Sequence, residues 1–226
     1  LNDFSIDKLK SMFETRKQDE IKIGNGVVTT LDPALQQASY DALGNNKGAV
    51  VALNPKTGEV LAMVSKPTYN PNDLKAAMDA ANAGSADDSP LINRATAGLY
   101  PPGSTFKTIT LTSALENISG ITNRTFIDEG KIVFNDSHSL SNANNAVYGT
   151  IDLREAFKVS SNVVFGTLAM ELGNDKLKAT AEDYGFNNSI EANGFTIENS
   201  RFPELKSYET GSIAQTGIGQ SSILAT

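Results

Sequence analysis

Two short apolar runs joined by a turn constrain the fold of this chain more than any other feature. The runs cover residues 48–53 and 59–64, and Asn54–Pro55–Lys56–Thr57–Gly58 lies between them. Proline and glycine at these places are typical of a β-turn, so the pattern predicts a β-hairpin. Both runs are almost continuously apolar instead of alternating, which indicates a sheet that is covered on both faces.

Helical segments alternate with the strand-like segments in an irregular order. Asp32 stands before Pro33, which predicts a capped helix over residues 33–43 that ends at Gly44. A short helix is predicted over residues 74–81. The alternation favours an α/β fold of the α+β type, with a central sheet and helices on both of its faces.

The composition excludes several classes of function. The 226 residues include no cysteine and a single histidine, His138, so disulfides, thiolate metal sites and two-histidine metal sites are excluded. The formal net charge is −7, whereas binding to nucleic acid requires a field of lysine and arginine. We therefore expect no cofactor, no metal and no nucleic-acid partner.

The best candidate for chemistry follows Pro101–Pro102–Gly103, which cannot continue a helix. A helix is predicted to begin at Ser104 with Lys107 one turn later, and residues at this spacing share a helix face with Cβ atoms about 5–6 Å apart. A serine hydroxyl attacks well once a base takes its proton, and burial lowers the pKa of a lysine so that it can be that base. Taken alone, however, the pair also fits a helix cap followed by a surface lysine.

A second candidate, Ser160–Ser161–Asn162, interrupts a helical pattern. Asp152 and Glu155 have the spacing of a capping box, and a helical pattern resumes over residues 163–172 until Gly173 ends it. On its own this junction could be no more than the N-cap of the second helix.

Taken together, the segments resemble the transpeptidase domain of penicillin-binding proteins, class B in particular. The two motifs match the Ser-x-x-Lys and Ser-x-Asn elements of this superfamily. The similar stretches are Asn93–Arg94–Ala95 and residues 27–43, 48–64, 65–72, 100–107 and 216–220. The resemblance implies a β-lactamase/transpeptidase-like fold over residues 25–226, with residues 1–24 as a connector or the tail of an N-terminal non-catalytic domain.

The resemblance also implies an activity and roles for four residues. The chain would be a peptidoglycan D,D-transpeptidase that cross-links stem peptides and is inhibited by β-lactams. Ser104 would be the nucleophile, Lys107 its base, Ser160 the proton relay to the leaving amine and Asn162 the group that holds the substrate amide. The implied surroundings are the extracytoplasmic face of the bacterial membrane, an anchor outside this chain and a cell-wall synthesis complex.

The third motif of the family, Lys-Thr-Gly, is expected on a strand after Ser-x-Asn. The only such tripeptide is Lys56–Thr57–Gly58, which precedes Ser104 and fits the hairpin turn. We therefore expect a domain that is incomplete at its C-terminus and inactive as this chain alone. In the family this strand supplies one donor of the oxyanion hole, and losing one such donor typically costs about 10²–10³ in rate.

Two other functions fit the same motifs. Ser-x-x-Lys with Ser-x-Val is the class D β-lactamase pattern, and Ser161–Asn162–Val163 satisfies it one place along. A non-enzymatic penicilloyl-sensor domain would carry both motifs as well. Residues 27–43 and 65–72 favour the transpeptidase over the β-lactamase.

Overall fold

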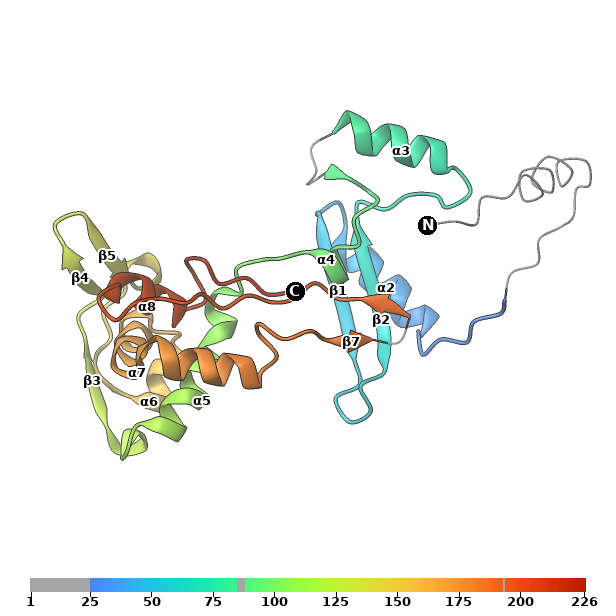
Figure 1. Cartoon of the computed structure of the whole chain (residues 1–226). Coiled ribbons are helices and arrows are strands. Elements are labelled where there is room, and N and C mark those ends of the chain that lie inside the picture. Colours follow the sequence, from blue (N-terminus) through green and yellow to red (C-terminus); the bar gives the residue numbers. More distant parts are fainter. Residues whose placement is uncertain (1–24, 85–87, 193) are drawn as a thin grey trace, which may run out of the picture.

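The structure, a computed structural model, describes residues 25–84, 88–192 and 194–226. Figure 1 shows a smaller part that contains β1, β2 and α2 and a larger, mainly helical part around α7, joined by extended segments. The mixture of helices and strands confirms the predicted mixed fold class. The described strands pair as four two-stranded antiparallel sheets, so these residues do not form the single central sheet that was expected. The connector predicted at residues 1–24 lies outside the described residues.

The predicted hairpin is present as β1 (Gly48–Leu53) and β2 (Val60–Lys66). The turn closes through a hydrogen bond from Gly58 N to Asn54 O of 2.8 Å, and Gly58 adopts a φ of 76°. Since only glycine takes such a φ without steric cost, Gly58 is required by the turn itself. This accounts for the early Lys-Thr-Gly without any catalytic role.

Helix α2 (Pro33–Leu43) packs on β2 and begins as predicted, with the Asp32 carboxylate accepting hydrogen bonds from two backbone N–H groups. The Gln36 side chain exchanges two hydrogen bonds with the backbone of Met63, of 2.7 and 2.8 Å. The side chain thereby gives hydrogen-bond partners to the backbone N–H and C=O of Met63 at the edge of β2. Two further helices belong to this region, α3 (Leu74–Ala83) and α4 (Arg94–Ala97).

The core of the larger part forms around α7 (Asn162–Asp183), against which α5 (Lys107–Asn117) and α8 (Thr210–Thr216) pack. The predicted end of the first helical segment at Gly173 is confirmed, because its φ of 75° and ψ of 168° are not helical. A second helical segment of α7 follows this kink and runs to Asp183, and it buries Leu177 and Ala181 completely.

The remaining elements lie mostly around this helical core. They are η3 (Gly103–Phe106), η4 (Ile121–Asn123), β3 (Thr125–Asp128), β4 (Lys131–Asn135), β5 (His138–Ser141), η5 (Ala143–Asn145), β6 (Gly149–Asp152), α6 (Leu153–Lys158), β7 (Glu191–Ala192) and β8 (Phe195–Thr196). Strand β3 pairs with β6 and β4 pairs with β5, so the segment between α5 and α7 folds back over the start of α7.

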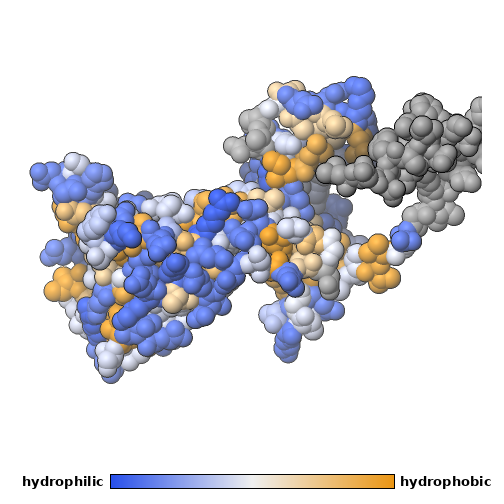
Figure 2. Space-filling model, in the orientation of Figure 1, coloured by the Kyte–Doolittle hydropathy of each residue, from blue (hydrophilic) through white to orange (hydrophobic). Residues whose placement is uncertain are grey.

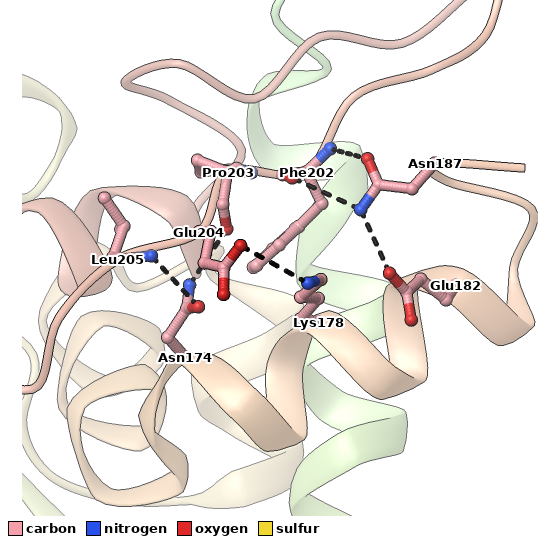
Figure 3. A network of polar contacts seen from close by, with 8 residues as sticks. All are labelled: Asn174, Lys178, Glu182, Asn187, Phe202, Pro203, Glu204 and Leu205. Carbon is pink, nitrogen blue, oxygen red and sulfur yellow. Dashed lines mark hydrogen bonds and ion pairs between the residues drawn. The ribbon is translucent and has the colours of Figure 1, made fainter.

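A polar network fastens the segment after β8 to the second half of α7 (Figure 3). The buried Asn174 amide donates to Pro203 O and accepts from Leu205 N, while Asn187 accepts from Phe202 N at 2.9 Å. Phe202 in turn stacks on Phe106 with ring centroids 5.9 Å apart. The network therefore supports the helical turn that carries Ser104.

The surface differs between the two parts. Figure 2 shows a largely hydrophilic face on the helical part and several hydrophobic patches on the smaller part, where Val51 and Leu53 of β1 are exposed. Within the described residues, every helix is too short or too polar to cross a membrane.

Candidate active site

Ser104 lies in a short 3₁₀ turn, η3, that precedes α5. The helix was predicted to begin at Ser104, but the regular α-helix begins at Lys107 and η3 supplies the first turn. Such tight turns are frequent at helix starts. The spacing still has its predicted effect, because Ser104 is exposed while Lys107 points inward and is 1% exposed.

The backbone before Ser104 is held by the segment that follows α8. Gly103 N donates to Gly219 O at 2.9 Å, and a Cβ on Gly219 would lie 2.0 Å from Gly103 O. The buried Thr110 hydroxyl donates to Gly217 O at 2.7 Å. The similarity of residues 216–220 to the family signalled this segment in the sequence, and the structure gives it a position against the nucleophile turn.

The Lys107 amine joins the two motifs. Its Nζ lies 3.2 Å from Ser104 Oγ, 2.9 Å from Ser160 Oγ, 2.7 Å from Ser160 O and 2.7 Å from Asn162 Oδ1. The structure thus brings all four predicted site residues to one point, although Ser160 and Asn162 come from a distant stretch of the chain. Their catalytic roles stay predictions.

Burial sets the proton affinity of this amine. It lowers the pKa of Lys107 from 10.5 to about 8, because the charged form loses its hydration. The four hydrogen-bonding neighbours of Nζ are uncharged oxygen atoms, so they offer no anion to restore the ordinary value. A lysine in this state exchanges protons close to neutral pH.

The junction between α6 and α7 presents Ser160 to Lys107 and turns Ser161 away. Ser160 has a φ of 56°, in the left-handed region, and its hydroxyl and carbonyl both face Nζ. Ser161 is fully buried, donates to Asp128 Oδ2 at 2.5 Å and accepts from Val164 N at 2.9 Å. Of the two serines that could begin the second motif, Ser160 therefore contacts the amine.

Two residues beside the junction were missed by the sequence analysis, Asp128 at the end of β3 and Asn142 after β5. Both are buried, and they hydrogen bond to each other and to the junction. In the sequence Asn142 lies in a polar, asparagine-rich stretch that reads as a loop, and no local pattern sets either residue apart from its neighbours.

In the part of the chain that the structure describes, no group of three or more histidine, cysteine, aspartate or glutamate side chains is arranged so that it could hold a metal ion. The ring of His138 hydrogen bonds with Asn135 Oδ1 in the β4–β5 hairpin.

A sequence-family model described as the penicillin binding protein transpeptidase domain matches residues 48–226. The chain belongs to this family. Among its relatives, the peptidoglycan D,D-transpeptidase PbpA of Mycolicibacterium smegmatis is 38% identical over 219 residues, which cover 90% of this chain and 44% of PbpA. The family membership predicted from the motifs is confirmed.

Solved structures of the transpeptidase family have the same fold. The D,D-transpeptidase domain of a peptidoglycan glycosyltransferase from Eggerthella lenta aligns with a TM-score of 0.79 and 40% identity, over 93% of this chain and 51% of that one. Penicillin-binding protein A from Mycobacterium tuberculosis, solved as its imipenem acyl-enzyme, aligns with a TM-score of 0.79 and 33% identity, over 97% of this chain and 52% of that one. The chain therefore spans about half the length of these relatives.

Proposed function

We propose that this chain is the part of a peptidoglycan D,D-transpeptidase that carries the nucleophile, and that Ser104 forms the acyl-enzyme. One observation supports this most directly: a buried lysine with a lowered pKa lies between the Ser104 hydroxyl and the Ser160–Asn162 junction. Relatives named peptidoglycan D,D-transpeptidases and a relative solved as a β-lactam acyl-enzyme add support.

The hydrogen-bond inventory of Lys107 explains how it accepts a proton. Ser160 O and Asn162 Oδ1 can only accept hydrogen bonds. The oxygen of the Asn162 amide is the end that faces Lys107, because its nitrogen donates to Ser141 O at 2.8 Å. A neutral amine uses its two N–H groups on these two acceptors. Its lone pair is then left for a hydroxyl proton, and Ser104 supplies it.

The reaction follows in two steps. Ser104 Oγ attacks the penultimate D-Ala carbonyl of a stem peptide as its proton passes to Lys107 Nζ, and the C–N bond to the terminal D-Ala breaks. The leaving amine takes a proton through the Ser160 hydroxyl, which lies 2.9 Å from Nζ. An amine of a neighbouring stem peptide then attacks the ester and gives a proton to Lys107, which passes it to Ser104 Oγ as the ester C–O bond breaks.

Asn162 is assigned to the substrate. One N–H of its side-chain amide donates to Ser141 O, and the other is the donor that we assign to an amide carbonyl of the stem peptide. β-Lactams enter by the same route: Ser104 opens the lactam C–N bond, the ring nitrogen takes the proton, and the acyl-enzyme persists because no acceptor amine displaces it.

The test is intact-protein mass spectrometry after incubation with benzylpenicillin, in the protein as its gene encodes it. The wild type should gain one penicilloyl group. In Ser104→Ala the rate of this acylation should fall by a factor on the order of 10⁴. Replacement of the exposed Ser119 by alanine is the matched control and should change nothing. Full acylation of Ser104→Ala would end the proposal.

Two further measurements separate the transpeptidase from its alternatives. Release of D-Ala from a stem-peptide or thioester mimic is expected for a transpeptidase, whereas a penicilloyl sensor acylates and stops. Continuous turnover of nitrocefin, in place of one stoichiometric burst, would indicate a β-lactamase.

The setting of the protein is also a proposal. Because peptidoglycan lies outside the cytoplasmic membrane, we place the domain on the extracytoplasmic face, held by an anchor outside this chain and working within a cell-wall synthesis complex. The relatives named as peptidoglycan enzymes support this placement. Labelling of the domain in intact cells by a membrane-impermeant reagent tests it, and labelling only after lysis would contradict it.

A further inference from the structure

The junction at residues 160–162 delivers three of the four atoms that contact Lys107 Nζ. The backbone of this junction has an uncommon conformation, since Ser160 has a φ of 56°, in the left-handed region. A non-glycine residue is strained in this region and persists only where its surroundings impose it. Something in the structure must therefore hold the junction.

The holding contacts come from two buried side chains outside both motifs. Asn142 Oδ1 accepts hydrogen bonds from Asn162 N at 2.8 Å and Val163 N at 3.1 Å. These are N–H groups at the start of α7, which have no partner within the helix. The Asn142 side chain therefore ties the first turn of α7, and with it Asn162, to the segment after β5.

Asp128 fixes the orientation of Asn142 and anchors the middle residue of the junction. Its carboxylate is fully buried and accepts from Asn142 Nδ2 at 2.8 and 3.0 Å, from Gly130 N at 2.9 Å and from Ser161 Oγ at 2.5 Å. The Asn142 amide nitrogen also donates to Ala146 O at 2.9 Å. A reversed Asn142 amide would point its oxygen at a carboxylate, so only one orientation is allowed.

We propose that Asp128 and Asn142 are positioning residues for acyl transfer, which hold the Ser160–Asn162 junction in the conformation that presents its acceptor oxygens to Lys107. This inference rests on the proposed function. The hydrogen-bond partners of the amine belong to Ser104, Ser160 and Asn162, so Asp128 and Asn142 act through the junction. Without them the junction relaxes, water reaches Lys107 and the amine is less desolvated.

Two nearly isosteric variants test the proposal against a simple effect of charge. Asp128→Asn removes a negative charge, and Asn142→Asp adds one in the same network. If charge alone mattered, the two variants would shift the pH midpoint of acylation in opposite directions. If positioning matters, both should lower the acylation rate roughly ten- to hundredfold and both should raise the midpoint.

The measurement is the rate of acylation by benzylpenicillin as a function of pH, per folded molecule, in the protein as its gene encodes it. Asp136→Asn and Asn144→Asp make the same chemical changes at exposed positions nearby and are the matched controls. Opposite shifts, or unchanged rate and midpoint in the folded variants, would overturn the proposal. Loss of folded protein with an unchanged rate per folded molecule would also overturn it.

Ser161→Ala is the fallback should either variant fail to fold. It removes one link to Asp128 and the N-cap hydrogen bond from Val164 N, but leaves the bonds of Asn142 intact. A shift in the same direction, smaller than in the first variants, is expected, and an unchanged rate and midpoint would overturn the proposal. Ser104→Ala is measured in the same experiment. If Ser104→Ala is still acylated, the proposed function is wrong. If Ser104→Ala is not acylated but the Asp128 and Asn142 variants react as the wild type does, only this inference is wrong.

Discussion

Lys107 is the residue whose behaviour the structure determines most closely. Its pKa is lowered to about 8 by burial, so below that pH most of the amine carries a proton and cannot accept one from Ser104. We expect the acylation rate to rise about tenfold per pH unit below pH 8 and to level off above it. The rate constant for benzylpenicillin, measured between about pH 6 and pH 10, checks this.

Lys107→Arg is the matched control, since an arginine keeps a charge but stays protonated throughout this range. Acylation should fall by on the order of 10³ and lose its dependence on pH. A wild-type midpoint of the acylation rate near the ordinary lysine pKa would contradict the assignment.

Burial of Lys107 also affects stability. Between about pH 8 and 10.5 the unfolded chain binds a proton at this lysine that the folded chain has lost, so the free energy of unfolding should rise with pH across that window.

At the scale of elements, the segment after α8 fixes the nucleophile turn through a contact that only glycine permits. Gly219 has a φ of 72°, and a Cβ there would lie 2.0 Å from Gly103 O. Gly219→Ala should therefore lower the free energy of unfolding by at least about 2 kcal/mol and slow acylation. Gly211→Ala in α8 meets only ordinary contacts with Phe134 and should be neutral or stabilising by up to about 1 kcal/mol.

Urea denaturation and acylation of the two glycine variants measure both effects, and equal stability of the two would contradict the packing argument.

The elements also differ in how far the sequence could predict them. The β1–β2 hairpin and the start of α2 follow from local turn and capping residues. The helical segment of α7 after Gly173 does not, because burial of Leu177 in the core favours it and no local signal marks it.

The same division applies to the site at the scale of the whole molecule. Ser104 and Lys107 could be paired from spacing alone, because one helical turn joins them. Ser160 and Asn162 could be placed beside them only through family resemblance, since tertiary packing makes that contact. Asp128 and Asn142 could not be found, because their importance lies in a hydrogen-bond network that exists only in the folded chain.

The whole molecule also sets the last prediction. The early Lys-Thr-Gly is the turn between β1 and β2 in the smaller part (Figure 1), so it does not supply the third motif of the family. In the family that motif contributes an oxyanion-hole donor, and losing one donor typically costs about 10²–10³ in rate. We therefore expect the isolated 226-residue chain to be acylated by benzylpenicillin at least about 10²-fold more slowly than the protein as its gene encodes it. Circular dichroism confirms that both are folded, and Ser104→Ala in each gives the background. Equal rates in the two folded forms would mean that the described residues already hold every donor the reaction needs.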